Sequence, residues 1–195
     1  MIPVREPCVP AEISDHELMR QLASGQRDAL ALLVQRHQDK VRGLACRFLG
    51  RWDGAEDVCQ DAFLRVYETA AQYQPNGQFT TWLYRVVANL CWDRRKRARR
   101  EAQALPNGSW AGWATNDEMP VERRERLERI CRAVAALPER QRLVLVLSRY
   151  GNLTRAEIVA VTGWSLPAVE SCLVRAYRRL RELLSDEEDG CGGRD

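Results

Sequence analysis

A basic run near the middle of the chain carries side chains that suit contact with nucleic acid. Arg94 to Arg100 holds six basic side chains in seven positions, and it follows a helical pattern that bears Trp82, Tyr84 and Trp92. Guanidinium groups bind phosphates and aromatic rings stack on unpaired bases, so the combination indicates opened or single-stranded DNA as the ligand. The alternative is a solvated helix end that complements the helix dipole, with the tryptophans filling the core.

A second candidate site lies between Thr154 and Arg178, which have the pattern of a helix-turn-helix. Thr154 and Glu157 can form a capping box at the start of a short helix, Gly163 suits a tight turn, and Ser165 can cap the next helix. An ordinary helical hairpin is the alternative. Helical periodicity turns Ile158, Val161, Val169 and Leu173 inward and leaves an outward stripe able to enter a major groove, namely Ala168, Glu170, Ser171, Val174, Arg175 and Arg178.

Enzyme chemistry is not visible in the sequence. There is no phosphate-binding loop, no His-Glu-x-x-His and no Gly-x-Ser-x-Gly. The two histidines, His16 and His37, lack partners at helical spacing, which favours a solvated or capping role. The seven cysteines form no Cys-x-x-Cys pair, and those in helical patterns suit small apolar core positions. We therefore expect no catalytic residue, no metal site and no cofactor.

The elements that position these residues are all predicted to be helices. Apolar side chains recur at every third or fourth position, which predicts helices from about Ser14 to Gly25, Asp28 to Leu49, Gly54 to Ala71 and onward from Phe79. The turn-forming run from Tyr73 to Gln78 predicts a loop before the last of these. We expect an all-α fold.

The 195-residue chain divides into two small helical domains joined by a flexible linker, the second a four-helix helix-turn-helix domain. The linker is expected where periodicity is lost and glycine and proline gather. The expected division is an N-terminal extension and first helix over 1–25, a first domain over 26–103, the linker over 104–120, a second domain over 121–184 and a disordered acidic tail over 185–195.

Overall charge and hydropathy indicate less about function than the motifs do. The net charge is only +3, which by itself does not identify a nucleic-acid partner. No stretch approaches the ~20 apolar residues of a membrane span, and the N-terminus lacks the order of a secretory signal. We expect a soluble, cytoplasmic protein without membrane insertion.

The order of four motifs resembles that of the extracytoplasmic-function (ECF, group 4) sigma factors of bacterial RNA polymerase, in the sigma-70 family. The motifs are Ala55 to Tyr67, Phe79 to Asn89 with Asp93 and Arg94, Ala136 to Arg142, and the helix-turn-helix. The resemblance implies a promoter-specificity subunit that binds polymerase core, reads the minus-35 element with domain 4 and melts the minus-10 element with domain 2. It also implies an anti-sigma factor as a partner.

The resemblance assigns roles to individual residues. The minus-35 element would be read by the outward stripe from Ala168 to Arg178. The recognition helix that carries this stripe has Glu170 and Cys172 where many members carry basic residues. The clamp helices of the polymerase's largest subunit would bind Asp57, Gln60, Asp61, Leu64 and Arg65. The minus-10 element would be bound by Asn76, Gln78, Phe79, Trp82, Tyr84, Arg85, Arg94, Arg95, Lys96 and Arg97.

Two other functions fit parts of the sequence. A stand-alone helix-turn-helix regulator would occupy an operator without polymerase, and a helical adaptor would use the basic run only as a solvated surface. The regulator has no use for the acidic face from Glu56 to Asp61, and the adaptor has no use for a recognition helix.

Overall fold

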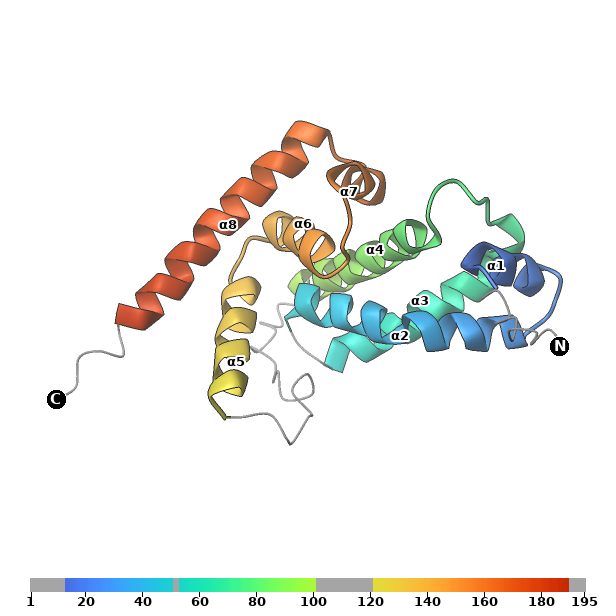
Figure 1. The fold of residues 1–195 in the computed structure, drawn as a ribbon, viewed down its shortest axis with the longest axis horizontal. Helices are drawn as coiled ribbons and strands as arrows, with labels where there is room; N and C mark the ends of the chain where they lie inside the picture. The colour runs from blue at the N-terminus through green and yellow to red at the C-terminus, as the bar shows by residue number, and fades with distance from the viewer. Residues whose placement is uncertain (1–12, 51–52, 101–120, 190–195) are drawn as a thin grey trace, which may run out of the picture.

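The computed structural model describes residues 13–50, 53–100 and 121–189, and all regular structure in these ranges is helical (Figure 1). The predicted all-α fold is confirmed. The predicted linker, 104–120, lies outside the described residues. The elements are α1 (Asp15–Ala23), α2 (Asp28–Leu49), α3 (Asp53–Thr69), the 3-10 turn η1 (Ala70–Gln72), α4 (Phe79–Arg100), α5 (Val121–Ala135), α6 (Glu139–Arg149), α7 (Arg155–Thr162) and α8 (Leu166–Asp189). The last helix therefore includes the first residues of the segment predicted as a tail.

Local side-chain chemistry sets the helix ends. Ser14 caps α1 by accepting a hydrogen bond from the Glu17 amide. Gly50 ends α2 in the left-handed conformation, with φ of 78°, a conformation that glycine adopts at no steric cost. At the start of α7, Thr154 and Glu157 form the predicted capping box.

The first four helices pack as one group. α2 lies along α3, α1 packs on α2, and α3 and α4 run side by side with the loop of residues 73–78 joining them at one end (Figure 1). The apolar face of each helix is turned into a shared core because the helices bury residues three and four positions apart. Fully buried side chains of this core include Leu18, Leu33, Phe48, Val66 and Leu83.

The last four helices hold the helix-turn-helix. Ile158, Val161, Val169 and Leu173 are buried, and the whole predicted outward stripe of α8 is exposed, so both predicted faces are confirmed. No single helix in the described ranges combines the length and apolar content of a bilayer crossing; α7 and α8 through Ser185 do so only as a pair bent by 108°.

The two groups of helices share one core. α7 packs on α4, and both α5 and α6 pack on α2, so the first helix of the helix-turn-helix lies against the first group while α8 extends away from it (Figure 1). Arg142 of α6, only 4% exposed, donates from Nη1 to the Phe48 carbonyl at the end of α2 at 3.0 Å. The groups therefore contact each other through apolar and polar side chains together.

Candidate nucleic-acid interface

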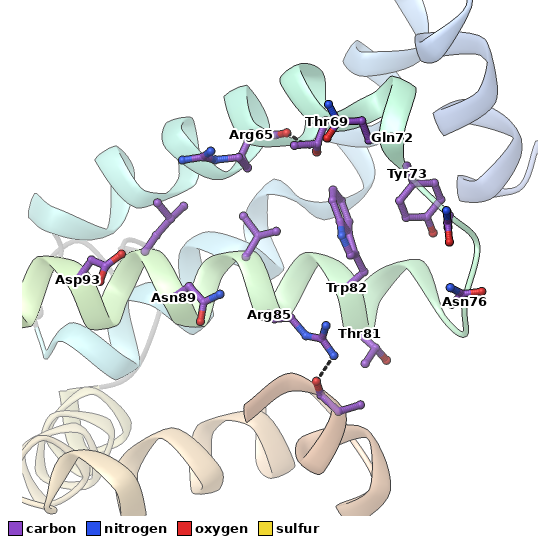
Figure 2. A pocket seen from close by; sticks show the side chains of 14 residues that line it. Arg65, Thr69, Gln72, Tyr73, Asn76, Thr81, Trp82, Arg85, Asn89 and Asp93 are labelled. Atoms are coloured by element: carbon purple, nitrogen blue, oxygen red, sulfur yellow. Dashed lines mark hydrogen bonds between the residues drawn. The ribbon is translucent and has the colours of Figure 1, made fainter. Parts of the chain in front are cut away.

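A cavity of about 660 Å³ lies between α3, α4 and the loop that joins them. Figure 2 shows Trp82 reaching from α4 toward α3, Tyr73 and Asn76 at one end, and Asp93 at the other. The wall thus combines aromatic rings, amides and guanidinium groups. Its lining residues are Arg65, Thr69, Gln72, Tyr73, Gln74, Asn76, Thr81, Trp82, Arg85, Val86, Asn89, Leu90, Asp93 and Ala160.

Aromatic rings build the end of the cavity nearest the loop. The Tyr73 and Trp82 rings meet edge to face, with centroids 5.0 Å apart. Phe79 lies beneath them, its centroid 5.7 Å from that of Trp82 and 6.1 Å from that of Tyr73. Edge-to-face pairs fix ring orientation. The half-buried Trp82 consequently presents a stable surface to the cavity.

The predicted minus-10 residues divide between this cavity and the core. Asn76, Trp82 and Arg85 line the cavity, whereas Gln78 is exposed outside its lining, and its carbonyl accepts from the amides of Thr81 and Trp82 in α4. Phe79 and Tyr84 are each 3% exposed. These two side chains pack inside the protein, where DNA does not reach them.

The basic end of α4 is partly engaged within the protein. Arg94 pairs with Asp57 of α3. Arg95 pairs with Glu139 of α6 and donates to the Leu49 carbonyl at 3.3 Å. Lys96 and Arg97 are exposed. Two of the predicted phosphate contacts are thus open to solvent, and two hold helices together.

The residues predicted to bind polymerase lie on two sides of α3. Gln60 and Leu64 line a groove of about 610 Å³ between α2 and α3, whose walls are mostly apolar and include Phe63 and Tyr67. Asp57 and Arg65 face α4 instead, through the pair with Arg94 and at the edge of the cavity. Asp61 is exposed. The set is therefore not one continuous patch.

The outward stripe of α8, the second helix of the helix-turn-helix, is exposed to solvent. Val174 is 58% exposed, and Arg175 and Arg178 are exposed beside it. Glu170 lies 3.7 Å from Arg155 of α7, an ion pair that spans the two helices of the motif. The stripe therefore carries apolar, acidic and basic groups with which to contact base edges.

Several lining residues of the cavity are missing from the sequence-based assignment of minus-10 residues, among them Thr69, Gln72 and Asn89. Asn89 lies four positions after Arg85 and seven after Trp82, so helical spacing on α4 is a signal that could have found it. Thr69 and Gln72 have no such signal, because their place depends on how α3 packs beside α4.

The histidines correct one expectation. His37 is 6% exposed and its Nε2 lies 2.9 Å from a carboxylate oxygen of Asp15, so it is a core residue rather than a solvated one. The contact spans 22 positions, and a search at helical spacing misses it.

The prediction of cysteines as core residues is confirmed for four positions, and burial raises the pKa of the thiols of Cys46 and Cys59 to about 11. No group of three metal-ligating side chains is found within the described ranges.

Comparison with known proteins assigns this architecture to a family. The model of sigma-70 region 2 matches residues 33–101, and that of sigma-70 region 4 matches residues 127–180. The RNA polymerase sigma factor CarQ of Myxococcus xanthus is 32% identical over 87% of this chain and 97% of its own length. The ECF RNA polymerase sigma factor SigW of Bacillus subtilis is 29% identical over 86% of this chain and 95% of its own.

A solved structure of CnrH in complex with the cytosolic domain of CnrY aligns with a TM-score of 0.65 at 27% identity, over 88% of this chain and 97% of that chain. Fold and site thus define a helical DNA-binding initiation factor made of sigma regions 2 and 4. The chain belongs to the ECF sigma factors of the sigma-70 family, which direct RNA polymerase to promoters in transcription initiation.

Proposed function

We propose that the cavity between α3 and α4 holds a base of the minus-10 element after that base has left the DNA stack. The observation that carries the proposal is that Asn76 and Trp82 line the same cavity (Figure 2). An extruded base gains stacking on an aromatic wall and hydrogen bonds to its edge, which offset the cost of unstacking it. Trp82 offers the ring, and the Asn76 amide both donates and accepts.

The same proposal divides the remaining DNA contacts by their chemistry. Arg85 beside the cavity, and Lys96 and Arg97 at the exposed end of α4, bind phosphates of the displaced strand and of the adjoining duplex. The outward stripe of α8 reads the minus-35 element in the major groove, with Arg175 toward the bases. Residues 26–103 and 121–184 are the two functional domains in this division.

Polymerase docking is proposed for the groove between α2 and α3. Its apolar wall, with Leu64 55% and Tyr67 43% exposed, suits apolar side chains of the clamp helices, and Gln60 and Glu56 supply polar contacts at its rim. Asp61 lies outside this groove and suits a rim contact with a basic side chain. Leu64 and Tyr67, the exposed apolar side chains of this groove, would then be buried in the contact.

An anti-sigma factor is the remaining proposed partner. Two solved relatives are described as complexes of a sigma factor with such a protein or with a partner's cytosolic domain, which supports a similar partner here. We also propose that the chain works in the cytoplasm, together with polymerase, and that it catalyses no reaction itself.

Transcription from pre-melted templates tests the base-holding cavity. Holoenzyme is assembled with each variant, and the non-template strand carries an abasic site at one minus-10 position at a time. We expect one position where the abasic site lowers open-complex formation by roughly fivefold or more, given ~1 to 3 kcal/mol per stacked base.

Asn76→Ala should abolish that dependence, while the exposed Arg181→Ala on α8 should preserve it. A wild-type protein indifferent to every abasic site, or an Asn76→Ala variant that keeps the full dependence, would show that the cavity holds no base.

A further inference from the structure

Helix α1 contacts one end of the loop of residues 73–78 through a hydrogen bond and a ring contact. The Tyr73 hydroxyl lies 2.8 Å from Nδ1 of His16, and the two rings stack with centroids 5.9 Å apart. Burial, together with the nearby Asp15 carboxylate, raises the pKa of Tyr73, so the hydroxyl keeps its proton. The hydroxyl can therefore donate to His16 while its ring meets Trp82 in the cavity wall.

The other end of the loop is supported from the adjacent residue of α1. Asp15 accepts at Oδ2 from Nε2 of His37 at 2.9 Å and at Oδ1 from Arg36 at 3.0 Å. The His37 ring in turn packs on Phe79, with centroids 5.3 Å apart. Asp15 thus orients the ring beneath Phe79, the first residue of α4.

Between these two ends the loop makes few contacts of its own. Residues 74–78 are all exposed, and the internal bond of the loop runs from the Asn76 amide to the Gln74 carbonyl at 2.7 Å. Asp15, His16, Gly77 and Gln78 line a second pocket, separate from the cavity. The position of Asn76 at the cavity consequently depends on where Tyr73 and Phe79 are held.

We propose that His16 is a positioning residue for base capture: through Tyr73 it holds the loop in the place where Asn76 can meet an extruded base. The matched region 2 model begins at residue 33, so α1 lies outside it. The inference rests on the proposed role of the cavity and adds α1 as the element that positions its loop.

The test measures base discrimination, the ratio of open-complex formation on intact and abasic pre-melted templates, together with the thermal midpoint of each free variant. His16→Phe keeps a ring but loses the acceptor, and Tyr73→Phe loses only the hydroxyl. Each should lower discrimination roughly three- to tenfold, the loss of one hydrogen bond. The double variant should lose no more than either single one, because both remove the same bond.

Two further variants separate positioning from general stability. His16→Asn places an amide near the position of Nδ1 and should restore most of the discrimination. Ser24→Ala removes a side-chain bond to the Gln21 carbonyl at the opposite end of α1 and should leave discrimination unchanged.

The outcomes distinguish this inference from the proposed function. Unchanged discrimination in Tyr73→Phe, or an equal loss in Ser24→Ala, overturns the positioning role of His16. The proposed role of the cavity in holding a base is not affected by either result. A wild-type protein without discrimination, or full discrimination in Asn76→Ala, overturns the proposed function and this inference with it.

Discussion

The buried guanidinium of Arg142 stands where two helices end. It donates to the carbonyl of Phe48 at the end of α2 and to those of Ala135 and Leu137 beside the end of α5. Helix C-termini carry unpaired carbonyls and partial negative charge, which suit a cation. Burial still lowers the pKa of Arg142, to about 10, so the group is charged at neutral pH. One side chain therefore satisfies several orphaned acceptors at once.

Replacing Arg142 should thus destabilise the fold more than replacing an exposed arginine does. Arg142→Met leaves buried carbonyls unpaired and should lower the free energy of unfolding by about 2 to 4 kcal/mol. Arg142→Lys should recover little, since one ammonium lacks the spread of the guanidinium fork. Urea denaturation measures both, with the exposed Arg149→Met as the matched control. A loss no larger than that of the control would contradict this role.

Arg175 carries the residue-scale prediction for promoter reading. It is exposed on α8 between Ser171 and Arg178, where a helix in the major groove presents side chains to base edges. Arg175→Ala should cost about 1 to 3 kcal/mol of promoter binding and relax the minus-35 preference. Binding of holoenzyme to promoters with single minus-35 substitutions measures this. Arg181→Ala should preserve the preference, and an Arg175→Ala variant with undiminished preference would remove Arg175 from base reading.

At the scale of the element, the capping box of α7 couples helix stability to pH. The Thr154 amide donates to the Glu157 carboxylate at 2.8 Å, and the Thr154 hydroxyl accepts from the Glu157 amide at 3.3 Å. Hydrogen bonds from the Thr154 side chain and backbone lower the pKa of Glu157. A lowered folded-state pKa means that the carboxylate stabilises the fold above its unfolded pKa and loses this effect as pH falls through the folded value.

Glu157→Gln should accordingly be less stable than the wild type at pH 7, and the difference should shrink as pH falls below about 4.3, the ordinary carboxyl value. Thr154→Ala should cost about 1 kcal/mol at pH 7. Chemical denaturation across this pH range measures both variants, with Glu182→Gln on the exposed face of α8 as the control. A difference that is constant with pH would show that the carboxylate adds nothing.

The helices also show which structural features can be predicted from the sequence. Periodicity predicted the inward and outward faces of α7 and α8, because both depend on residues three or four positions apart. The contact of Arg142 with Phe48 spans 94 positions, and that of Tyr73 with His16 spans 57. Such contacts follow from helix packing, which no local pattern encodes. The cavity was therefore predictable by its loop and α4 residues but not by those of α3.

At the scale of the whole molecule, the helix-turn-helix covers part of the proposed minus-10 surface. Arg85 donates to the Ala160 carbonyl of α7 (Figure 2), and Thr81 donates to Glu157. The Trp92 and Trp164 rings meet edge to face, with centroids 6.4 Å apart. Ala160 itself closes one side of the cavity. If Arg85 binds a phosphate as proposed, it must release the Ala160 carbonyl, and we therefore expect the two groups of helices to separate when the protein binds a promoter.

Loosening the contact between the groups should therefore favour DNA binding. Glu139 of α6 pairs with Arg95 of α4, both side chains being less than a fifth exposed, so Glu139→Gln removes a partly desolvated charge pair. A compact chain of this length has a radius of gyration of roughly 16 Å, and separated groups exceed it. Small-angle scattering should give a larger radius for Glu139→Gln than for the wild type. Glu182→Gln, which removes an ion pair within α8, should leave the radius unchanged.

The separated form should also bind promoters more readily. Because a larger population of separated molecules lowers the free-energy cost of opening, Glu139→Gln should form open complexes at a lower holoenzyme concentration than the wild type. Identical scattering with identical promoter binding would mean that this pair does not hold the groups together.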